Sequence, residues 1–269
     1  MSQLVSTAGA IRRASRSMPW SLSHRRGDGA AHVQKPNTIG ENRLLKRLGA
    51  EDLSRLQPNL KEISMERGVV LHPAGEPIEH VYFPLSGMIS ILAVMRTGEQ
   101  IETAIVGREG VVGASIGSNG SQSAGQSTVQ IVGTAWQVQA SNFLELYKAS
   151  EPFRKLTNRF QNVIFLQAQQ SAACHALHSV EARLCRWLLQ SQDTTETDMV
   201  PLTQEFLSHM LGVQRTSVSL CAHTLQKAGL IRYSRGQIRI IDRTGLKESA
   251  CECYDVVREH INKAVPPLS

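Results

Sequence analysis

The chain has 269 residues, a formal net charge of +6 at pH 7 and 41% hydrophobic residues. This length leaves room for about two globular domains. No stretch approaches the ~20 consecutive apolar residues of a membrane span, and the N-terminus lacks the apolar core of a secretory signal. We therefore expect a cytoplasmic protein without a membrane partner, whose five cysteines are reduced thiols.

Residues 1–40 form the first segment. They are rich in Ser, Arg and Gly, contain few large apolar side chains, and carry six basic side chains against one acidic. Such a segment cannot bury enough surface to offset its loss of conformational entropy, so a disordered basic tail is predicted. It could contact DNA nonspecifically, but a solvated tail is the simpler interpretation.

Residues 41–152 are predicted to form a β-rich domain. A short helical entry over residues 42–60 is followed, from Ile63 to Val138, by glycines three to twelve residues apart with β-branched runs between them. Short strands at that spacing are typical of a β-sandwich or barrel. Residues 141–149 begin a return to helix.

Residues 153–178 are predicted to form a long helix. The stretch contains no Gly or Pro, and it carries a stripe of large apolar residues that continues as small ones, namely Leu156, Phe160, Val163, Ile164, Ala168, Ala172 and Ala176. A narrow face of small residues suits the close approach of a second helix. We interpret this helix as the place where two chains pair; a core helix within one subunit is the alternative.

Residues 179–250 contain the most specific pattern. Thr203 is the expected N-cap of a first helix, and Gly212 supplies a sharp turn. A second helix follows over residues 214–228, and a short hairpin over residues 231–241 carries arginines at its outward positions. This order is that of a winged helix-turn-helix, whose second helix is expected in the major groove of DNA. Residues 201–246 hold six basic side chains and two acidic ones, which favours the same interpretation.

The predicted DNA contacts follow from this arrangement. Polar side chains at the start of the second helix would contact base edges, namely Arg215, Thr216, Ser217 and Ser219, helped by Leu220. Gln214, Arg232 and Arg235 would hold phosphate.

The cysteine and histidine side chains do not predict a metal site. Cys174 and His178 are four residues apart on one helix face, but no Cys-x-x-Cys pair or carboxylate completes a ligand set. Residues 251–269 are predicted to form a C-terminal helix and tail. Within a helix over residues 246–260, Cys251 and Cys253 would point to different faces. We therefore expect packing roles for these residues, with no metal and no cofactor.

The order of a β-rich domain, a long helix and the sequence from Leu202 through Gly212 to Val218 resembles the cyclic-AMP receptor protein and fumarate–nitrate regulator (Crp/Fnr) family of bacterial transcription factors. The resemblance covers roughly residues 42–245. It implies an α+β fold with an N-terminal double-stranded β-helix, which is a cyclic-nucleotide-binding-like β-roll, then a long dimerisation helix and a C-terminal winged helix-turn-helix. It also implies a homodimer that binds promoter or operator DNA, with RNA polymerase left open as a further partner.

The resemblance also defines where this chain departs from the family. Arg215 falls where members place an arginine that reads guanine or holds phosphate. Thr216 often corresponds to an acidic residue, and Leu220 to a second arginine. A leucine can contact a thymine methyl but cannot donate to guanine, so the DNA half-site should differ from the best-known family sites.

The effector pocket departs further. Members that bind cyclic nucleotide use a Gly-Glu element for the ribose and an Arg-Ser or Arg-Thr pair for the phosphate. The matching elements here lack the glutamate and the arginine, and comprise Gly113, Ala114, Ser115, Gln126, Ser127 and Thr128. A buried phosphate would rest on neutral donors alone, so we predict an effector other than a cyclic nucleotide. The iron–sulfur version of the family is also disfavoured, because no cysteine precedes Cys174.

Two alternatives to a DNA-binding regulator remain open. One is a ligand-binding or protein-interaction module whose winged helix contacts protein. The other is an enzyme, which is not expected because the chain has no phosphate-binding glycine loop, nucleophile elbow or two-histidine zinc helix.

Overall fold

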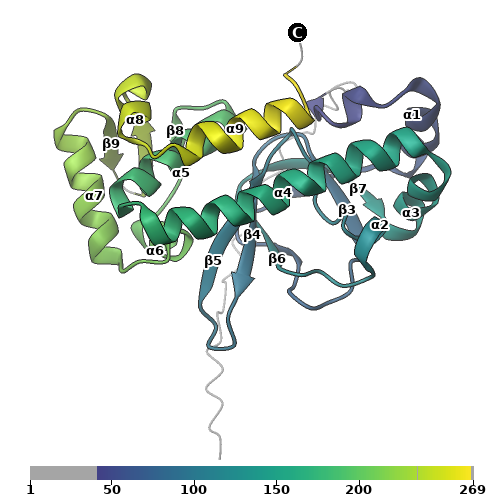
Figure 1. The fold of residues 1–269 in the computed structure, drawn as a ribbon, viewed down its shortest axis with the longest axis horizontal. Coiled ribbons are helices and arrows are strands. Elements are labelled where there is room, and N and C mark those ends of the chain that lie inside the picture. Colours follow the sequence, from purple (N-terminus) through teal and green to yellow (C-terminus); the bar gives the residue numbers. More distant parts are fainter. Residues whose placement is uncertain (1–40, 235, 268–269) are drawn as a thin grey trace, which may run out of the picture. The chain divides into compact units, whose positions relative to one another are not determined.

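The computed structural model describes residues 41–234 and 236–267 (Figure 1). The tail predicted over residues 1–40 and the predicted phosphate contact Arg235 lie outside the described residues.

The first part of the described chain is a β-roll of two antiparallel sheets. A helical entry leads into it through η2 (Leu45–Arg47), α1 (Ala50–Leu56) and η3 (Gln57–Asn59). One sheet has the order β1-β7-β3, formed by Lys61–Met65, Gly133–Gln139 and His80–Pro84. The other has the order β2-β6-β4-β5, formed by Val70–His72, Gln126–Ile131, Met88–Val94 and Gln100–Val106. The predicted β-rich domain and its double-stranded β-helical class are confirmed.

Short helices complete the roll. Helix α2 (Ile116–Asn119) lies between β5 and β6, and α3 (Ala140–Ala149) follows β7. Phe83, Val129 and Phe143 are fully buried in the core of the roll. Burying such side chains contributes about 1.5–3 kcal/mol each, so the roll has a hydrophobic core of its own.

Two long helices follow, α4 (Glu151–Leu177) and α5 (Val180–Thr195). The hydroxyl of Ser150 caps α4 by accepting from the backbone N–H of Phe153 at 3.1 Å, and Ser179 caps α5 in the same way. His178 and Ser179 have extended backbone angles, which separate the two helices. A break of this kind permits the two helices to run in different directions.

The apolar stripe of α4 is divided between two faces. Phe160 and Val163 are buried in the core of the chain's own roll, while Ala172 and Ala176 are exposed. The large and small residues of the predicted stripe therefore do not share one face, because the large ones close the roll. The exposed face of α4 includes Phe165, which is 64% exposed.

The helix-turn-helix is formed by α6 (Gln204–Leu211) and α7 (Arg215–Lys227). As expected, Thr203 caps α6, and Gly212 takes the left-handed conformation (φ 60°) that ends it. The wing strands β9 (Ile231–Ser234) and β10 (Gln237–Ile240) pair antiparallel. A two-residue strand that the sequence did not predict, β8 (Met199–Val200), completes the sheet in the order β8-β10-β9.

The C-terminal region contains two helices rather than the single helix expected over residues 246–260. Helix α8 (Arg243–Ser249) ends at Ala250, whose backbone is extended (ψ 154°), and α9 (Cys253–Ala264) begins afresh. Helix α9 packs along α4 (Figure 1). Ala264 and Val265 belong to the core of the roll, so the end of the chain returns to the domain in which the described chain begins. Among the residues described, no helix is both long and apolar enough to cross a membrane.

Candidate nucleic-acid interface

Helix α7 begins with a turn that is open to solvent. Gln214 is its N-cap and makes no side-chain capping bond, and the first turn contains no acidic residue. Arg215 and Thr216 are exposed, and Ser217 is half-buried. The first N–H groups of a helix carry partial positive charge and bind anions such as phosphate. The start of α7 therefore combines a helix terminus with an arginine side chain at one point.

The next turn of α7 carries Ser219 and Leu220. The Ser219 hydroxyl donates to Oε1 of Gln204 at 2.7 Å and also lies 3.0 Å from the carbonyl oxygen of Arg215. This contact joins α7 to α6, so Ser219 helps to hold the angle between the two helices. The side chain of Leu220 is 67% exposed.

The wing lies beside α7. Gln226 of α7 accepts from the backbone N–H of Tyr233 at 2.8 Å, which fixes the first wing strand to the helix. Arg232 pairs in register with Arg239 on the second strand, and both side chains are exposed. Arg239 was not among the predicted contacts, although the period-two alternation of the hairpin places it on the same face as Arg232.

The core of the helix-turn-helix follows the helical period. Val218, Ala222 and Leu225 are all buried, and they pack in a cluster with Leu207 and Ile238. This inward face leaves Arg215, Thr216 and Leu220 exposed to solvent. The outward side of the helix is therefore not sealed under the chain's own apolar residues.

In the roll, His72 joins the two elements that correspond to the family's ribose and phosphate positions. A Cβ added to Gly113, which has φ +90°, would lie 2.8 Å from Cε1 of His72. Nε2 of His72 lies 2.7 Å from the carbonyl oxygen of His80, and Nδ1 lies 3.4 Å from the hydroxyl of Ser127. A carbonyl can only accept, so Nε2 carries the proton and Nδ1 accepts from Ser127. Burial lowers the pKa of His72, which favours a neutral ring.

The other side chains of these two elements are also neutral. Ala114 is buried, and Ser115 is half-buried at the N-cap of α2. Gln126 donates from Nε2 to the hydroxyl of Thr128 at 3.0 Å. Residues 110–144 contain no charged side chain. The arrangement therefore offers no cation to a phosphate from within these elements.

A buried carboxylate connects the roll to α5. Glu102 on β5 accepts hydrogen bonds from the hydroxyl of Ser90 and from Nε1 of Trp187, the latter at 2.7 Å. Burial raises the pKa of Glu102 to about 7, while the hydrogen bonds from Ser90 and Trp187 and the charge of Arg186 act to lower it. The contact was not foreseen, because a glutamate within an alternating strand is expected to face solvent.

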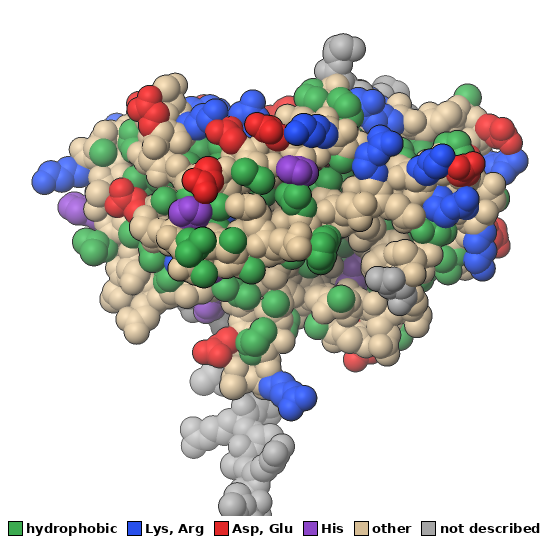
Figure 2. Space-filling model, in the orientation of Figure 1, with side chains coloured by type: hydrophobic (Ala, Val, Ile, Leu, Met, Phe, Trp, Pro, Cys, Tyr) green, Lys and Arg blue, Asp and Glu red, His purple; other side chains and the backbone are tan. Residues whose placement is uncertain are grey.

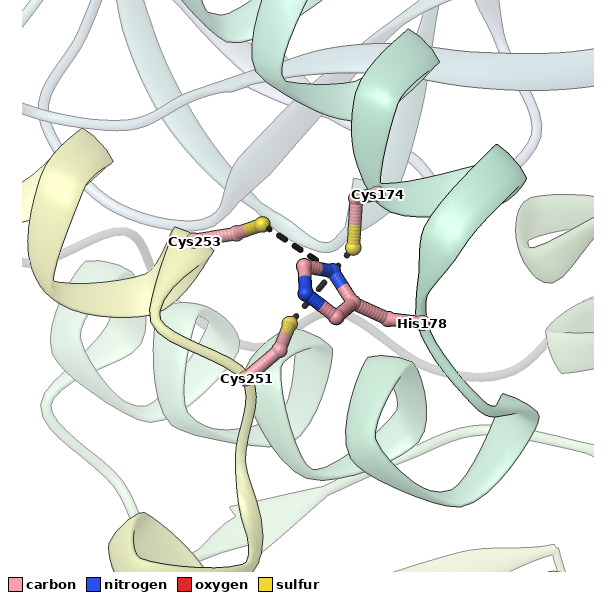
Figure 3. Close-up of side chains that lie close together, drawn as sticks. All are labelled: Cys174, His178, Cys251 and Cys253. Atoms are coloured by element: carbon pink, nitrogen blue, oxygen red, sulfur yellow. Dashed lines mark hydrogen bonds between the residues drawn. The ribbon is translucent and has the colours of Figure 1, made fainter.

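Four further side chains converge where α4 ends and α9 begins (Figure 3). Cys174, His178, Cys251 and Cys253 offer atoms that all lie within 4.8 Å of one another. Cys251 lies in the extended link before α9 and Cys253 at its first residue. The expectation that these two cysteines point to different helix faces was therefore wrong, since they do not share a helix.

A cyclic-nucleotide-type β-roll, followed by long helices and a winged helix-turn-helix, defines a class of transcription regulators. The sequence model of the protein family described as cyclic nucleotide-binding domain matches residues 62–150. The sequence model of the family described as Crp-like helix-turn-helix domain matches residues 182–249. Together they span more than half of the chain. The chain belongs to the Crp/Fnr family of transcriptional regulators. No curated protein matches it.

Solved structures share the fold at low sequence identity. A Crp/Fnr-family regulator from Eubacterium rectale is 19% identical with a TM-score of 0.62, over 77% of this chain and 96% of that one. FixK2 from Bradyrhizobium japonicum is 16% identical with a TM-score of 0.61, over 71% and 98%. The c-di-GMP-responsive regulator CLP from Xanthomonas campestris is 15% identical with a TM-score of 0.59, over 71% and 99%.

Proposed function

We propose that this chain is a cytoplasmic, homodimeric regulator that binds specific sites on double-stranded DNA through α7, and whose roll senses an effector other than a cyclic nucleotide. The observation that carries the proposal is the uncapped, solvent-exposed first turn of α7 with Arg215 at its head. A helix terminus and a guanidinium together suit a phosphate and a guanine edge.

The roles at the interface divide by chemistry. Arg215, Thr216 and Ser217 lie where a docked helix meets base edges. Leu220 offers an apolar contact to a thymine methyl, and Ser219 both faces the groove and orients α7 through Gln204. Gln214 and the wing arginines Arg232 and Arg235 contact phosphate, and Arg239 joins them because it lies in register with Arg232.

Pairing of two chains uses the exposed face of α4. Asn162, Phe165, Gln169, Ala172 and Ala176 are all exposed, and they recur at intervals of three and four residues. This is the spacing of a coiled-coil seam, and the two alanines permit close helix approach. Figure 2 shows hydrophobic side chains along the middle of α4 with few charged ones between them. A two-fold pair of α7 helices would then read two half-sites.

Selection from a random duplex library tests DNA recognition. The full chain should enrich a two-fold symmetric site, and its affinity should fall steeply with salt because phosphate contacts release counterions. Enrichment of no sequence would remove the DNA-binding proposal. That outcome would favour the alternative in which the winged helix contacts a protein. The Arg, Thr and Ser side chains of α7 argue against this alternative.

The effector is proposed to lie outside the cyclic-nucleotide class. The ring of His72 already links the two elements that would hold ribose and phosphate, and burial lowers its pKa, which favours the uncharged ring. Isothermal titration with cAMP, cGMP and c-di-GMP should give no heat of binding to the full chain. Binding of any of the three at micromolar concentration would contradict this part of the proposal.

A further inference from the structure

Cys174, His178, Cys251 and Cys253 form a cluster made from two segments that are far apart in sequence. Cys174 lies in the last turn of α4 and His178 is the residue that ends it, whereas Cys251 and Cys253 flank the start of α9. Figure 3 shows the three sulfur atoms directed at the imidazole of His178. The side chains of Cys174, Cys251 and Cys253 are buried, and that of His178 is half-buried.

The spacing of these atoms fits one ion rather than a covalent bond or a cluster. Sγ of Cys174 lies 3.5 Å from Sγ of Cys251, and Sγ of Cys253 lies 3.4 Å from Nδ1 of His178. Ligands held tetrahedrally at about 2.3 Å from zinc lie about 3.8 Å from one another. A disulfide requires sulfur atoms about 2.05 Å apart, and a four-iron cluster would separate its ligands by its inorganic core.

The surroundings supply positive charge that this cluster would balance. Arg183 and Arg186 are each only 5% exposed, and among the described residues the Nε atom of each has no hydrogen-bond partner. Both guanidinium groups interact electrostatically with Cys174. Buried cations are costly unless a negative charge lies close by. A zinc ion with three thiolates and a neutral imidazole carries a net charge of −1, which would compensate part of this positive charge.

The outer contacts also match those of a metal-binding histidine and thiolate. The Nε2 atom of His178 lies 4.0 Å from a carboxylate oxygen of Glu252. Gln170 donates from Nε2 to Sγ of Cys253 at 3.1 Å. In metal sites, a carboxylate near a ligating imidazole and an N–H donor to a ligating sulfur commonly orient the ligands.

We propose that Cys174, His178, Cys251 and Cys253 bind a single Zn²⁺ ion that fastens the end of α4 to the start of α9. Four protein ligands leave no open position, so the site is structural rather than catalytic. Each thiol must lose its proton on binding, and His178 binds through Nδ1 while Nε2 keeps its hydrogen. The proposal does not depend on DNA binding, because it concerns contacts within one chain.

Metal analysis of the full chain tests it. Protein expressed in medium supplemented with zinc, iron and cobalt, and purified without chelators, should retain about one zinc per chain by inductively coupled plasma mass spectrometry. Cys253→Ser and His178→Gln should each lose most of this zinc. Cys221→Ser, which removes a cysteine of α7 outside the cluster, should retain all of it, and circular dichroism should confirm that each variant is folded.

A second measurement uses the unmodified chain, in case the ligand variants do not fold. Cobalt-loaded protein should show sulfur-to-cobalt charge-transfer absorption and the intense visible bands of a tetrahedral site. Modification of the thiols with a mercurial should release the zinc to a chromophoric chelator. Retention of no metal, iron together with acid-labile sulfide, or a Cys174–Cys251 disulfide in protein alkylated at lysis would each overturn the proposal.

Discussion

Arg215 is the first residue of α7, where its guanidinium meets no acidic side chain in the first turn. Replacing Arg215 with alanine removes a bidentate donor to guanine, and we expect a loss of about 1–3 kcal/mol in binding to the selected site. Arg215→Lys keeps the charge but not the planar fork, so it should recover only part of that loss. Fluorescence anisotropy with a labelled duplex measures both.

The matched control for Arg215 is Arg55→Ala. Arg55 is an exposed arginine of α1 that pairs with Glu51 on the same helix, and such surface pairs contribute little. The affinity of the Arg55→Ala variant for the duplex should equal that of the unchanged chain. Equal affinity of Arg215→Ala and the unchanged chain would show that α7 does not read the site through this side chain.

Glu102 should make the stability of the chain depend on pH. Its pKa is raised to about 7 from 4.5, so the folded chain binds this proton more strongly than the unfolded chain does. The stabilising contribution is therefore fully present below pH 4.5 and is lost as the pH rises through 7, by on the order of 3 kcal/mol in all. Urea unfolding from pH 5 to pH 8 should show this loss.

Glu102→Gln isolates this contribution, because an amide does not titrate but can still accept from Trp187. Between pH 5 and pH 7 the unchanged chain should lose unfolding free energy relative to the Glu102→Gln variant, so the difference between the two should change steadily with pH. Glu99→Gln, in the exposed turn before β5, should leave the pH profile unchanged. Parallel profiles for Glu102→Gln and the unchanged chain would mean that Glu102 does not titrate in this range.

Residue by residue, prediction from sequence succeeded where local spacing decides the outcome. Thr203, Gly212 and the inward face of α7 follow from capping and from helical period, which are properties of neighbouring residues. Glu102 could not be found in this way. Its partner Trp187 is distant in the sequence, and alternation along a strand predicts only which face a side chain is on.

At the scale of elements, the exposed seam of α4 determines whether two chains pair. Phe165→Glu places a charge in the centre of that seam, and burying an unpaired carboxylate at an interface is costly. We expect the unchanged chain to be a dimer and the variant to be a monomer by light scattering after gel filtration. The monomer should also bind a two-fold DNA site much more weakly, because it loses one half-site.

Phe165→Leu is the control for this experiment, since it shortens the side chain while keeping the contact apolar. This variant should remain dimeric. A dimeric Phe165→Glu protein would place the pairing surface elsewhere on the chain.

The apolar positions of α4 illustrate what a helical pattern can and cannot predict. Periodicity identified a long helix with apolar residues on it, but it did not distinguish the side that packs on the roll from the side that faces outward. Phe160 and Val163 close the core, and the nearby Phe165 is exposed. That assignment depends on where the roll lies, which is a tertiary property.

At the scale of the whole molecule, α9 is expected to contribute substantially to stability. Tyr254, Val257, Ala264 and Val265 are almost fully buried, each with a relative exposure of 5% or less. Fully burying a side chain of Val size contributes about 1.5–3 kcal/mol. A chain ending at Ala250 should therefore melt well below the full chain in differential scanning fluorimetry.

Truncation after Val265 provides the comparison for this experiment. It removes residues 266–269 but keeps every buried residue of α9, so the melting temperature should stay close to that of the full chain. If the chain ending at Ala250 had the same melting temperature as the full chain, the packing of α9 would contribute nothing measurable to stability.

The cysteine cluster shows why whole-molecule features escaped the sequence. Its two halves are separated by more than 70 residues, and neither half alone contains a recognisable ligand pattern. They meet only because α8 and α9 are separate helices and α9 packs along α4. No rule of local spacing predicts the three-residue helix break over residues 250–252.

The return of the C-terminus to the roll has a practical consequence for protein engineering. Exchanging the DNA-reading region between relatives is commonly planned as a cut before the first helix of that region. In this chain, a graft of residues 179–250 alone would leave behind Tyr254, whose hydroxyl donates to Asp193 and accepts from Arg243 across the proposed cut. We expect a working chimera to require residues 251–265 together with the surface of α4 that receives them.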